Sequence, residues 1–372
     1  MYDRIENALE RMDSWVHQKG RVLPMALALP LSVTVRIPAT SANLGPGFDS
    51  LGLALQLHNR FEVEECDADP LLPPIVVHGD LGKELSTGPD NLFFRSFALL
   101  FEHLKLPLPS VRITMTIHVP PGCGLGSSAT AVVGGLVAAN EWIRMYEVER
   151  QPLKKEDLLD LAVEAEAGKH PDNVAPALLG GLVATTNLGG KIQAIKTPFP
   201  DKLKAVIFTP SFPMDTIAGR KLLPASYPKA DVTFNTGRVA MLILALQTGH
   251  YEVIGEAMQD RLHQPYRQAL FPAMPDIIQA AIDAGAHGAC LSGGGSSLIA
   301  LASDHLHDVL HAMQATAEAA GVQGTGRILR ADQQGARVVN GPRSRIRKEV
   351  SARYGDQFCW SPARPGIWRR EK

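Results

Sequence analysis

The stretch PPGCGLGSSA, Pro120 to Ala129, decides how this sequence is interpreted. It follows an apolar run, Val111 to Val119, that predicts a strand, and it opens a run of small residues, Ser127 to Met145, that predicts a helix. Glycines let a backbone approach an anion closely, successive N–H groups can converge on that anion, and a helix N-terminus adds a favourable dipole. The pattern therefore predicts a phosphate-binding loop. Its expected phosphate-binding residues are Pro121, Gly122, Cys123, Gly124, Leu125, Gly126, Ser127, Ser128 and Ala129.

Two other kinds of glycine-rich phosphate site do not match this loop. No lysine follows the glycines, as it would in a Walker A loop, and there is no GxGxxG run with a well-placed acidic residue. An ordinary glycine-rich turn between a strand and a helix stays open on this motif alone. Ser127 and Ser128 can either cap the helix or offer a hydroxyl to a phosphate or its Mg²⁺.

Length and composition exclude several classes of protein. The 372 residues predict two or three domains, or two close lobes, at about 150 residues per domain. With 37 Lys and Arg against 38 Asp and Glu, the net charge of −1 gives no global field for a nucleic acid or an anionic membrane, and we expect neither partner. The four cysteines are widely spaced and form no CxxC pair, which argues against a disulfide framework and indicates a cytoplasmic protein.

Two further stretches have the composition of binding loops. PATSANLGPGFD, Pro38 to Asp49, offers the polar side chains of Asn43 and Asp49 among glycine and proline turns. LSGGGSS, Leu291 to Ser297, contains three adjacent glycines, whose backbone entropy is costly. We therefore expect a close approach of another backbone or of a ligand at this second stretch.

The order of predicted elements indicates an α+β protein with antiparallel sheets, because runs of strands and helices follow one another without a regular βαβ rhythm. Further strands are predicted at Ser32–Ile37, Phe61–Glu65, Pro74–His78, Gly181–Thr186, Lys191–Ile195, Lys204–Phe208 and Leu298–Leu301. Further helices are predicted at Tyr2–His17, Asn91–Leu104, Lys155–Ala167, Thr233–Gln247 and Met274–Ala284.

The three glycine-containing stretches, in this order, resemble the signature motifs of the GHMP kinase superfamily. The loop Pro38 to Leu55 and a fourth block, HPDNVAPALLGGL from His170 to Leu182, are similar to those of the homoserine kinases within it. The resemblance spans Ser32 to Ala331. It implies a two-lobed fold, with an N-terminal lobe like ribosomal protein S5 and a ferredoxin-like C-terminal lobe that contains an antiparallel sheet.

The resemblance also implies a division of the chain. We expect an N-terminal extension over residues 1–30, an ATP-binding lobe over 31–190 and a second kinase lobe over 191–331. A basic, partly ordered tail is expected over 332–372, since this region has little apolar periodicity. A homodimer is a further implication of the resemblance.

The implied activity is ATP-dependent phosphorylation of the hydroxyl of L-homoserine, the step before threonine formation, with Mg²⁺ as the second cofactor. The family pattern implies two metal ligands, Ser128 and an acidic residue before the fourth block. Glu166 is the favoured acidic residue and Glu164 the alternative. The oxygen atoms of a serine and a glutamate are hard ligands, which suit Mg²⁺. Asn91 resembles the asparagine on the adenine side, although a helix cap explains it nearly as well.

The acceptor is a zwitterion, so its site needs partners for an ammonium and for a carboxylate. The resemblance implies that the ammonium and hydroxyl ends meet residues of the loop Pro38 to Leu55, called the first loop below, and of the fourth block. It also implies that two arginines bind the planar carboxylate. The implied substrate residues are Asn43, Asp49, His170, Asp172, Arg220 and Arg267. The third-motif turn is formed by Ser292, Gly293, Gly294 and Gly295.

Asn173 stands where other superfamily branches carry an aspartate as catalytic base. An amide cannot remove a proton, so we hypothesise direct in-line attack without a strong base, with Asn173, Ser128 and Glu166 as the catalytic residues. Two alternatives stay open. One is a GHMP kinase for another small alcohol, such as mevalonate or a diphosphocytidyl sugar alcohol, and the other is a non-catalytic sensor of nucleotide and amino acid.

Overall fold

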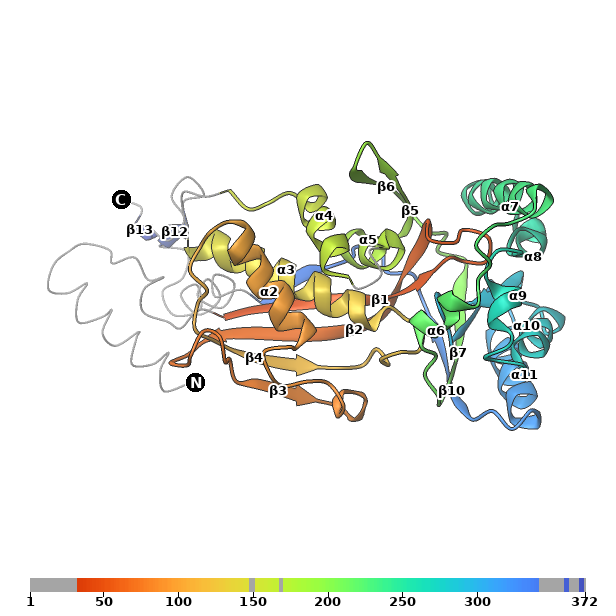
Figure 1. Ribbon diagram of the computed structural model, residues 1–372, viewed down its shortest axis with the longest axis horizontal. Coiled ribbons are helices and arrows are strands. Elements are labelled where there is room, and N and C mark those ends of the chain that lie inside the picture. The colour runs from red at the N-terminus through yellow and green to blue at the C-terminus, as the bar shows by residue number, and fades with distance from the viewer. Residues whose placement is uncertain (1–31, 147–150, 167–169, 341–357, 361–367, 371–372) are drawn as a thin grey trace, which may run out of the picture.

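The computed structural model describes residues 32–146, 151–166, 170–340, 358–360 and 368–370, and two large sheets divide these into two lobes (Figure 1). The predicted N-terminal helix at Tyr2–His17 and the whole extension 1–30 lie outside the described residues, as does most of the expected tail.

The first lobe consists of one seven-stranded sheet and the helices that cover it. Its strands are β1 (Ser32–Ala42), β2 (Leu51–Glu65), β3 (Ile75–His78), β4 (Val111–Thr116), β5 (Leu182–Leu188), β6 (Lys191–Thr197) and β11 (Arg337–Asn340). Its helices are η2 (Asp80–Gly82), α2 (Leu92–His103), α3 (Ser127–Tyr146), α4 (Lys155–Ala165) and α5 (Pro171–Leu179). The strand order is β11-β1-β2-β4-β3, with β5 paired to both β2 and β6.

Glycines allow the close packing of this lobe at two places. In α3, a side chain at Gly134 would meet the Phe61 ring and one at Gly135 would lie 2.4 Å from the Phe93 carbonyl oxygen, so α3 can press against both the sheet and α2. In β2, a Cβ on Gly52 would lie 1.9 Å from the carbonyl oxygen of Asp172. The glycine at this position therefore lets α5 approach the sheet with its polar N-terminal residues.

The second lobe has a four-stranded antiparallel sheet in the order β10-β7-β9-β8. These strands are β7 (Lys204–Pro210), β8 (Gly288–Leu291), β9 (Leu298–Ala302) and β10 (Gly324–Leu329). Its helices are α6 (Thr216–Lys221), α7 (Lys229–Thr248), η3 (Tyr251–Val253), α8 (Ile254–Ala257), α9 (Gln264–Arg267), α10 (Met274–Asp283) and α11 (Leu306–Ala319). A separate two-stranded ladder joins β12 (Phe358–Trp360) and β13 (Trp368–Arg370).

Two apolar clusters pack the second lobe, and one of them also joins it to the first. One contains Val206, Phe208 and Met313 and lies between the sheet and helices α10 and α11. The other joins Leu53 and Leu55 of β2 to Ile207 of β7. Because this second cluster draws side chains from both sheets, burial of its apolar surface stabilises the lobes together.

The structure differs from the expected organisation at three points. The expected lobe boundary at residue 190 falls in the turn between β5 and β6, which are paired strands of the first sheet. The expected tail from 332 begins with a buried residue, Asp332, and its β11 segment pairs with β1, so part of it completes the first lobe. β3 and β4 are parallel rather than antiparallel. The first difference comes from a hairpin between neighbouring strands, whereas the other two come from pairing between segments separated in the chain, about which local patterns carry no information.

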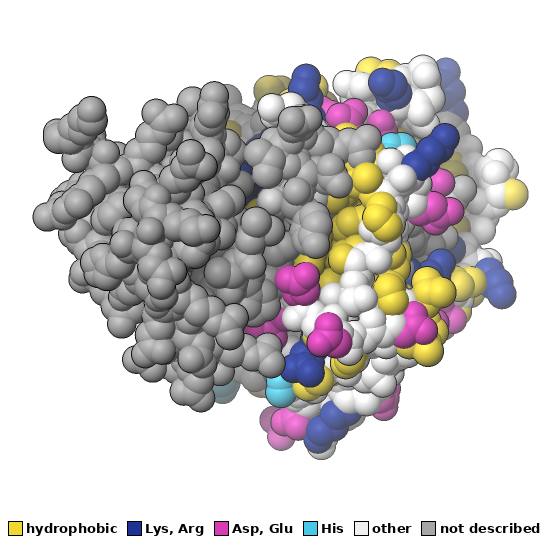
Figure 2. Space-filling view, turned by 90° about the vertical axis from the view of Figure 1, so that its left-hand side faces the viewer, with side chains coloured by type: hydrophobic (Ala, Val, Ile, Leu, Met, Phe, Trp, Pro, Cys, Tyr) yellow, Lys and Arg dark blue, Asp and Glu magenta, His cyan; other side chains and the backbone are white. Residues whose placement is uncertain are grey.

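The charges on the described surface are mixed. On the face shown in Figure 2, acidic and basic side chains of the described residues alternate and form no field of one sign. Within the same described ranges, no helix is long and apolar enough to cross a membrane.

Candidate active site

The phosphate-binding loop has the backbone that its glycines predict. Gly122, Gly124 and Gly126 adopt φ of +69°, +75° and +68°, a region that side chains other than glycine rarely enter. A Cβ on Gly124 would lie 2.2 Å from the carbonyl oxygen of Ser292. All three glycines are therefore needed for the backbone path, and Gly124 also for the close approach of the second lobe. The loop leads directly into the N-terminus of α3.

The third motif packs against this loop. The Ser292 hydroxyl donates to the Gly124 carbonyl oxygen at 2.7 Å, and the Ser297 amide donates to the Cys123 carbonyl oxygen at 2.9 Å. The Gly293 amide donates to the Ala42 carbonyl oxygen at the end of β1, at 3.1 Å. The three glycine-containing stretches, far apart in the chain, thus meet at one place between the lobes.

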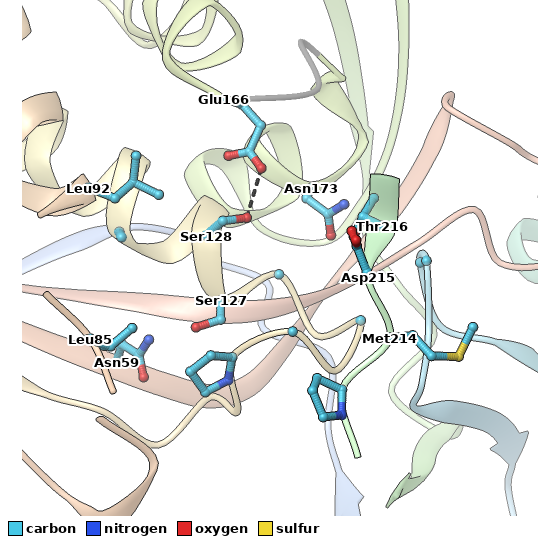
Figure 3. A pocket seen from close by; sticks show the side chains of 18 of the residues that line it. Asn59, Leu85, Leu92, Ser127, Ser128, Glu166, Asn173, Met214, Asp215 and Thr216 are labelled. Carbon is cyan, nitrogen blue, oxygen red and sulfur yellow. Dashed lines mark hydrogen bonds between the residues drawn. The ribbon is translucent and has the colours of Figure 1, made fainter. Parts of the chain in front are cut away.

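A cleft of about 840 Å³ opens beside the loop and draws its lining from both lobes (Figure 3). One part is largely apolar and is lined by Leu85, Leu92, Met115 and Ile117 of the first lobe. Another part is polar and charged, and is lined by Asn43, Ser128, Glu166, His170, Asp172, Asn173, Arg220, Arg267, Gly293 and Gly294. The cleft therefore has an apolar region suited to a flat base and a charged region suited to a small polar molecule.

Ser128 and Glu166 meet at this cleft. The Ser128 hydroxyl donates to Glu166 Oε1 at 2.8 Å, as Figure 3 shows. The other carboxylate oxygen, Oε2, is buried and has no hydrogen-bond partner among the described residues, and burial raises the pKa of Glu166. The alternative residue Glu164 is exposed.

A hard cation fits this pair of residues. A buried, unpartnered carboxylate oxygen next to a hydroxyl is an unfavourable arrangement unless a cation or proton occupies it. Within the described ranges, no group of three or more His, Cys, Asp or Glu side chains gathers to hold a metal. A divalent ion here would therefore take its remaining ligands from phosphate oxygens and water.

Asp49 lies in an ion pair with Arg220. Its carboxylate accepts from Arg220 Nη2 at 2.6 Å and from Nη1 at 3.1 Å, and His170 Nδ1 lies 3.5 Å from Asp49 Oδ2. Asp49 sits at φ +57°, where its amide donates to Asn43 Oδ1 at 3.0 Å. Asn43 also donates to the Gly293 carbonyl oxygen at 2.9 Å, so its amide holds the first loop to the third motif.

Asp172 is the most perturbed acid of the cleft. It lies at the start of α5 and is only 4% exposed. Burial raises its pKa to about 7, and the nearby carboxylates of Asp49 and Glu166 contribute in the same direction, whereas Arg220 opposes them. The group therefore lacks a full cationic partner and favours a positively charged ligand in its ionised form.

Arg267 enters the same part of the cleft from the second lobe and is 1% exposed. Its Nη1 contacts His263 Nδ1 at 2.7 Å, and the other ring nitrogen of His263 lies 2.8 Å from the Gly45 carbonyl oxygen. Burial, with the charge of Arg267 acting in the same direction, lowers the pKa of His263 to about 4, so the ring is neutral near pH 7 and its Nδ1 accepts from the arginine.

Both arginines retain a buried donor. The Nε groups of Arg220 and Arg267 are buried and have no hydrogen-bond partner among the described residues. The two guanidinium carbons lie 5.3 and 5.5 Å from the centre of the same ring, that of Phe48. Two unsatisfied cationic donors near one ring make this part of the cleft suited to an anionic group.

Two predicted site residues have structural partners of their own. Asn91 is the N-cap of α2, where its Oδ1 accepts from the amides of Phe93 and Phe94, although the residue also lines the cleft. Asn173 lines the cleft from α5 and accepts a hydrogen bond from Thr40 at 2.8 Å.

Sequence reasoning did not single out Thr40, Phe48 or His263. Thr40 and Phe48 lie inside the first loop that was singled out, but residue type alone does not show that they contact site residues. His263 has no diagnostic neighbours, and its role depends on a contact with Arg267 that only the fold creates.

Comparison with known proteins agrees with the fold and the loop. Residues 91–181 match the family model of the GHMP kinases N terminal domain, and residues 242–319 match that of the GHMP kinases C terminal region. A homoserine kinase of Microchaete diplosiphon is 42% identical over 312 residues, which is 83% of this chain and 98% of that protein. This chain belongs to the homoserine kinase family. The family is part of the GHMP kinases, so the expected two-lobed α+β fold and the kinase class are confirmed.

Other homoserine kinases are similar to this chain in sequence and fold, and a mevalonate kinase is similar in fold. A homoserine kinase of Desulfitobacterium hafniense is 40% identical over 308 residues, 82% of this chain and all of that protein. The crystal structure of homoserine kinase from Cytophaga hutchinsonii superposes with a TM-score of 0.73 at 30% identity, over 83% of this chain and 97% of that one. The Methanococcus jannaschii mevalonate kinase, at 18% identity and a TM-score of 0.59 over 80% of this chain and 98% of that one, shares the fold.

Proposed function

We propose that this chain transfers the γ-phosphoryl group of ATP to the hydroxyl of L-homoserine, forming O-phospho-L-homoserine for threonine biosynthesis. One observation supports L-homoserine as the substrate. The Nε donors of Arg220 and Arg267 have no hydrogen-bond partner among the described residues and lie near two carboxylates, beside the phosphate-binding loop. A small zwitterion has the complementary charges, whereas mevalonate has no ammonium group to pair with Asp49 and Asp172.

The phosphates of ATP are bound by the loop at the N-terminus of α3. Backbone N–H groups of Gly122 to Ser128 and the helix dipole stabilise the negative charge of the β- and γ-phosphates. Ser128 and Glu166 would hold Mg²⁺, which would neutralise charge that builds up on the phosphates during transfer. The apolar part of the cleft, near Leu85 and Ile117, receives the adenine ring.

The amino acid binds in the charged region. Its ammonium lies between Asp49 and Asp172, and its carboxylate accepts hydrogen bonds from Arg220 and Arg267. The ion pair between Asp49 and Arg220 is then replaced by two ion pairs, one between Asp49 and the substrate ammonium and one between Arg220 and the substrate carboxylate. Because the charges of the site already balance one another, the substrate replaces an existing ion pair rather than burying new uncompensated charge.

The reaction proceeds by in-line attack without a strong base. Asn173 orients the hydroxyl near the γ-phosphate, and the proton leaves to a phosphate oxygen as the new O–P bond forms. An Asn173→Asp variant tests this step. A large gain in kcat with a new acidic pKa in the rate profile would show that the natural site lacks a base it needs, whereas equal or lower kcat supports direct attack.

The function itself is tested by steady-state ADP release with Mg²⁺-ATP and a panel of L-homoserine, mevalonate and shikimate. We expect turnover with L-homoserine and only background release with the other two alcohols. Absence of homoserine-dependent ADP release from folded protein that binds ADP would refute the proposal. Binding of both ADP and L-homoserine without turnover would instead identify a sensor.

A further inference from the structure

Thr40, near the end of β1, has a side-chain contact that the roles above do not use. The residue is fully buried, and its hydroxyl donates to Asn173 Oδ1 at 2.8 Å. Its amide donates to the Leu125 carbonyl oxygen of the phosphate-binding loop at 3.0 Å. A Cβ on Gly126 would lie 1.9 Å from Thr40 Oγ1 and 3.2 Å from Asn173 Oδ1, so these three residues are in tight contact.

The hydroxyl distinguishes the two ends of the Asn173 amide. The Thr40 hydroxyl has one proton to donate, and among the described residues the Asn173 oxygen accepts that proton. If the amide were reversed, its nitrogen could donate to the hydroxyl oxygen, but the buried hydroxyl proton would then lose its acceptor, which is unfavourable. Thr40 therefore favours one orientation of the amide over the other.

The favoured orientation turns the amide nitrogen away from Thr40. Nδ2 donates one N–H to Asp172 Oδ1 at 3.4 Å, and Asn173 projects into the cleft between the Ser128–Glu166 pair and Thr216 of the second lobe, as seen in Figure 3. The group that Asn173 offers to the cleft is thus a hydrogen-bond donor, while its acceptor oxygen is occupied.

We propose that Thr40 is a positioning residue that fixes Asn173 with its remaining N–H directed to the attacking hydroxyl. The proposal rests on the function proposed above. Asn173 then donates to one lone pair of the hydroxyl oxygen while the other lone pair forms the bond to the γ-phosphorus. The bond from that phosphorus to the bridging oxygen breaks to release ADP, and the hydroxyl proton passes to a phosphoryl oxygen.

The test compares Thr40→Val, which keeps the shape and removes the hydroxyl, with Thr40→Ser, which keeps the hydroxyl. We expect Thr40→Val to lower kcat about tenfold, the scale of one hydrogen bond, with the KM for ATP unchanged. Thr40→Ser should stay within about threefold of the wild type. ADP affinity and the thermal midpoint are measured for each variant, and Thr40→Ala replaces Thr40→Val if the latter does not fold.

A double-mutant cycle separates positioning from a general structural role. In an Asn173→Ala background the amide is gone, so Thr40→Val should change kcat less than about twofold. An equal loss in both backgrounds, or wild-type kcat in Thr40→Val itself, overturns the proposal.

A readout without turnover separates failure of this inference from failure of the proposed function. The Asn173 side-chain amide signals in nitrogen-15 NMR, assigned by their absence in Asn173→Ala, should form one sharp pair in the wild type and broaden or double in Thr40→Val. Unchanged signals overturn the positioning role. If the wild-type protein is inactive but Thr40→Val still changes these signals, the homoserine kinase reaction is refuted and the positioning role is not.

Discussion

The carboxylate of Asp49 and the guanidinium of Arg220, 171 positions apart in the chain, form a bidentate ion pair at 2.6 and 3.1 Å. The pair joins the first loop to α6 of the second lobe, and its Arg220 side lines the charged region of the cleft. Each partner carries the charge of one end of an amino acid. In the proposed binding mode, Arg220 exchanges the carboxylate of Asp49 for that of the substrate.

Arg220→Lys tests this exchange. Lysine keeps the charge but cannot bind a carboxylate through two parallel N–H groups, so we expect the KM for L-homoserine to rise about tenfold, with the KM for ATP unchanged. Lys221, the exposed neighbour on α6, supplies the control, since Lys221→Ala should leave both constants unchanged. An unaltered KM for L-homoserine in Arg220→Lys would remove Arg220 from the substrate site.

Gly126→Ala should disable the phosphate-binding loop. The residue is at φ +68° and its new Cβ would lie 1.9 Å from Thr40 Oγ1, so we expect the free energy of unfolding to fall by about 2 kcal/mol or more, and ADP affinity to fall with it. Gly237→Ala is the matched control. Gly237 lies in α7 with no atom within 4 Å of the added Cβ, so alanine there should raise stability by about 0.5–1 kcal/mol. Urea unfolding and ADP titration measure both effects, and equal stability changes in the two variants would contradict the strain assigned to the loop.

Glu166→Gln should raise the Mg²⁺ concentration needed for half-maximal rate by about tenfold, because one anionic ligand is lost. Ser128→Ala should shift it in the same direction, since the two side chains are hydrogen-bonded. Glu164→Gln is the control, because this neighbouring carboxylate is exposed. If Glu164→Gln raised the Mg²⁺ requirement while Glu166→Gln did not, the two assignments would have to be exchanged.

Asp172 should impose a pH dependence on substrate capture. Its pKa of about 7 in the free protein means that it is protonated at lower pH and cannot pair with an ammonium. We expect kcat/KM for L-homoserine to rise with pH up to about 7 and to stay level above it. Asp172→Asn should have a low kcat/KM that lacks this rise with pH. A limb that persists in Asp172→Asn would assign the titration to another group.

The same pKa predicts the pH dependence of stability. Between about pH 4 and pH 7 the unfolded carboxyl is ionised while the folded one holds its proton, so the native state binds more protons. Asp172 therefore lowers the free energy of unfolding as pH rises through this range. Replacement by asparagine should reduce that decline, as measured by urea unfolding at pH 4.5 and pH 7.5.

Many of the local elements were predictable from the sequence, although α6, α11, β8, β10 and β11 were not predicted. The predicted helix at Asn91–Leu104 corresponds to α2, and the predicted strand at Pro74–His78 corresponds to β3, because apolar periodicity and capping residues are local properties. α5 was not predicted, since Pro176 lies inside it. The extensions of β1 and β2 through the first loop were missed because both strands are almost continuously buried there and show no alternation.

The sequence by itself determined the glycine-rich turn before α3, the family and the charged residue types available to the cleft, because glycine patterns and short motifs require only neighbouring residues. The tertiary structure decided which of these residues interact. It paired Asp49 with Arg220, placed Glu166 rather than Glu164 beside Ser128, and joined Thr40 to Asn173 across 133 positions. It also raised the pKa of Asp172, since burial and the approach of distant charges arise only when the lobes fold together.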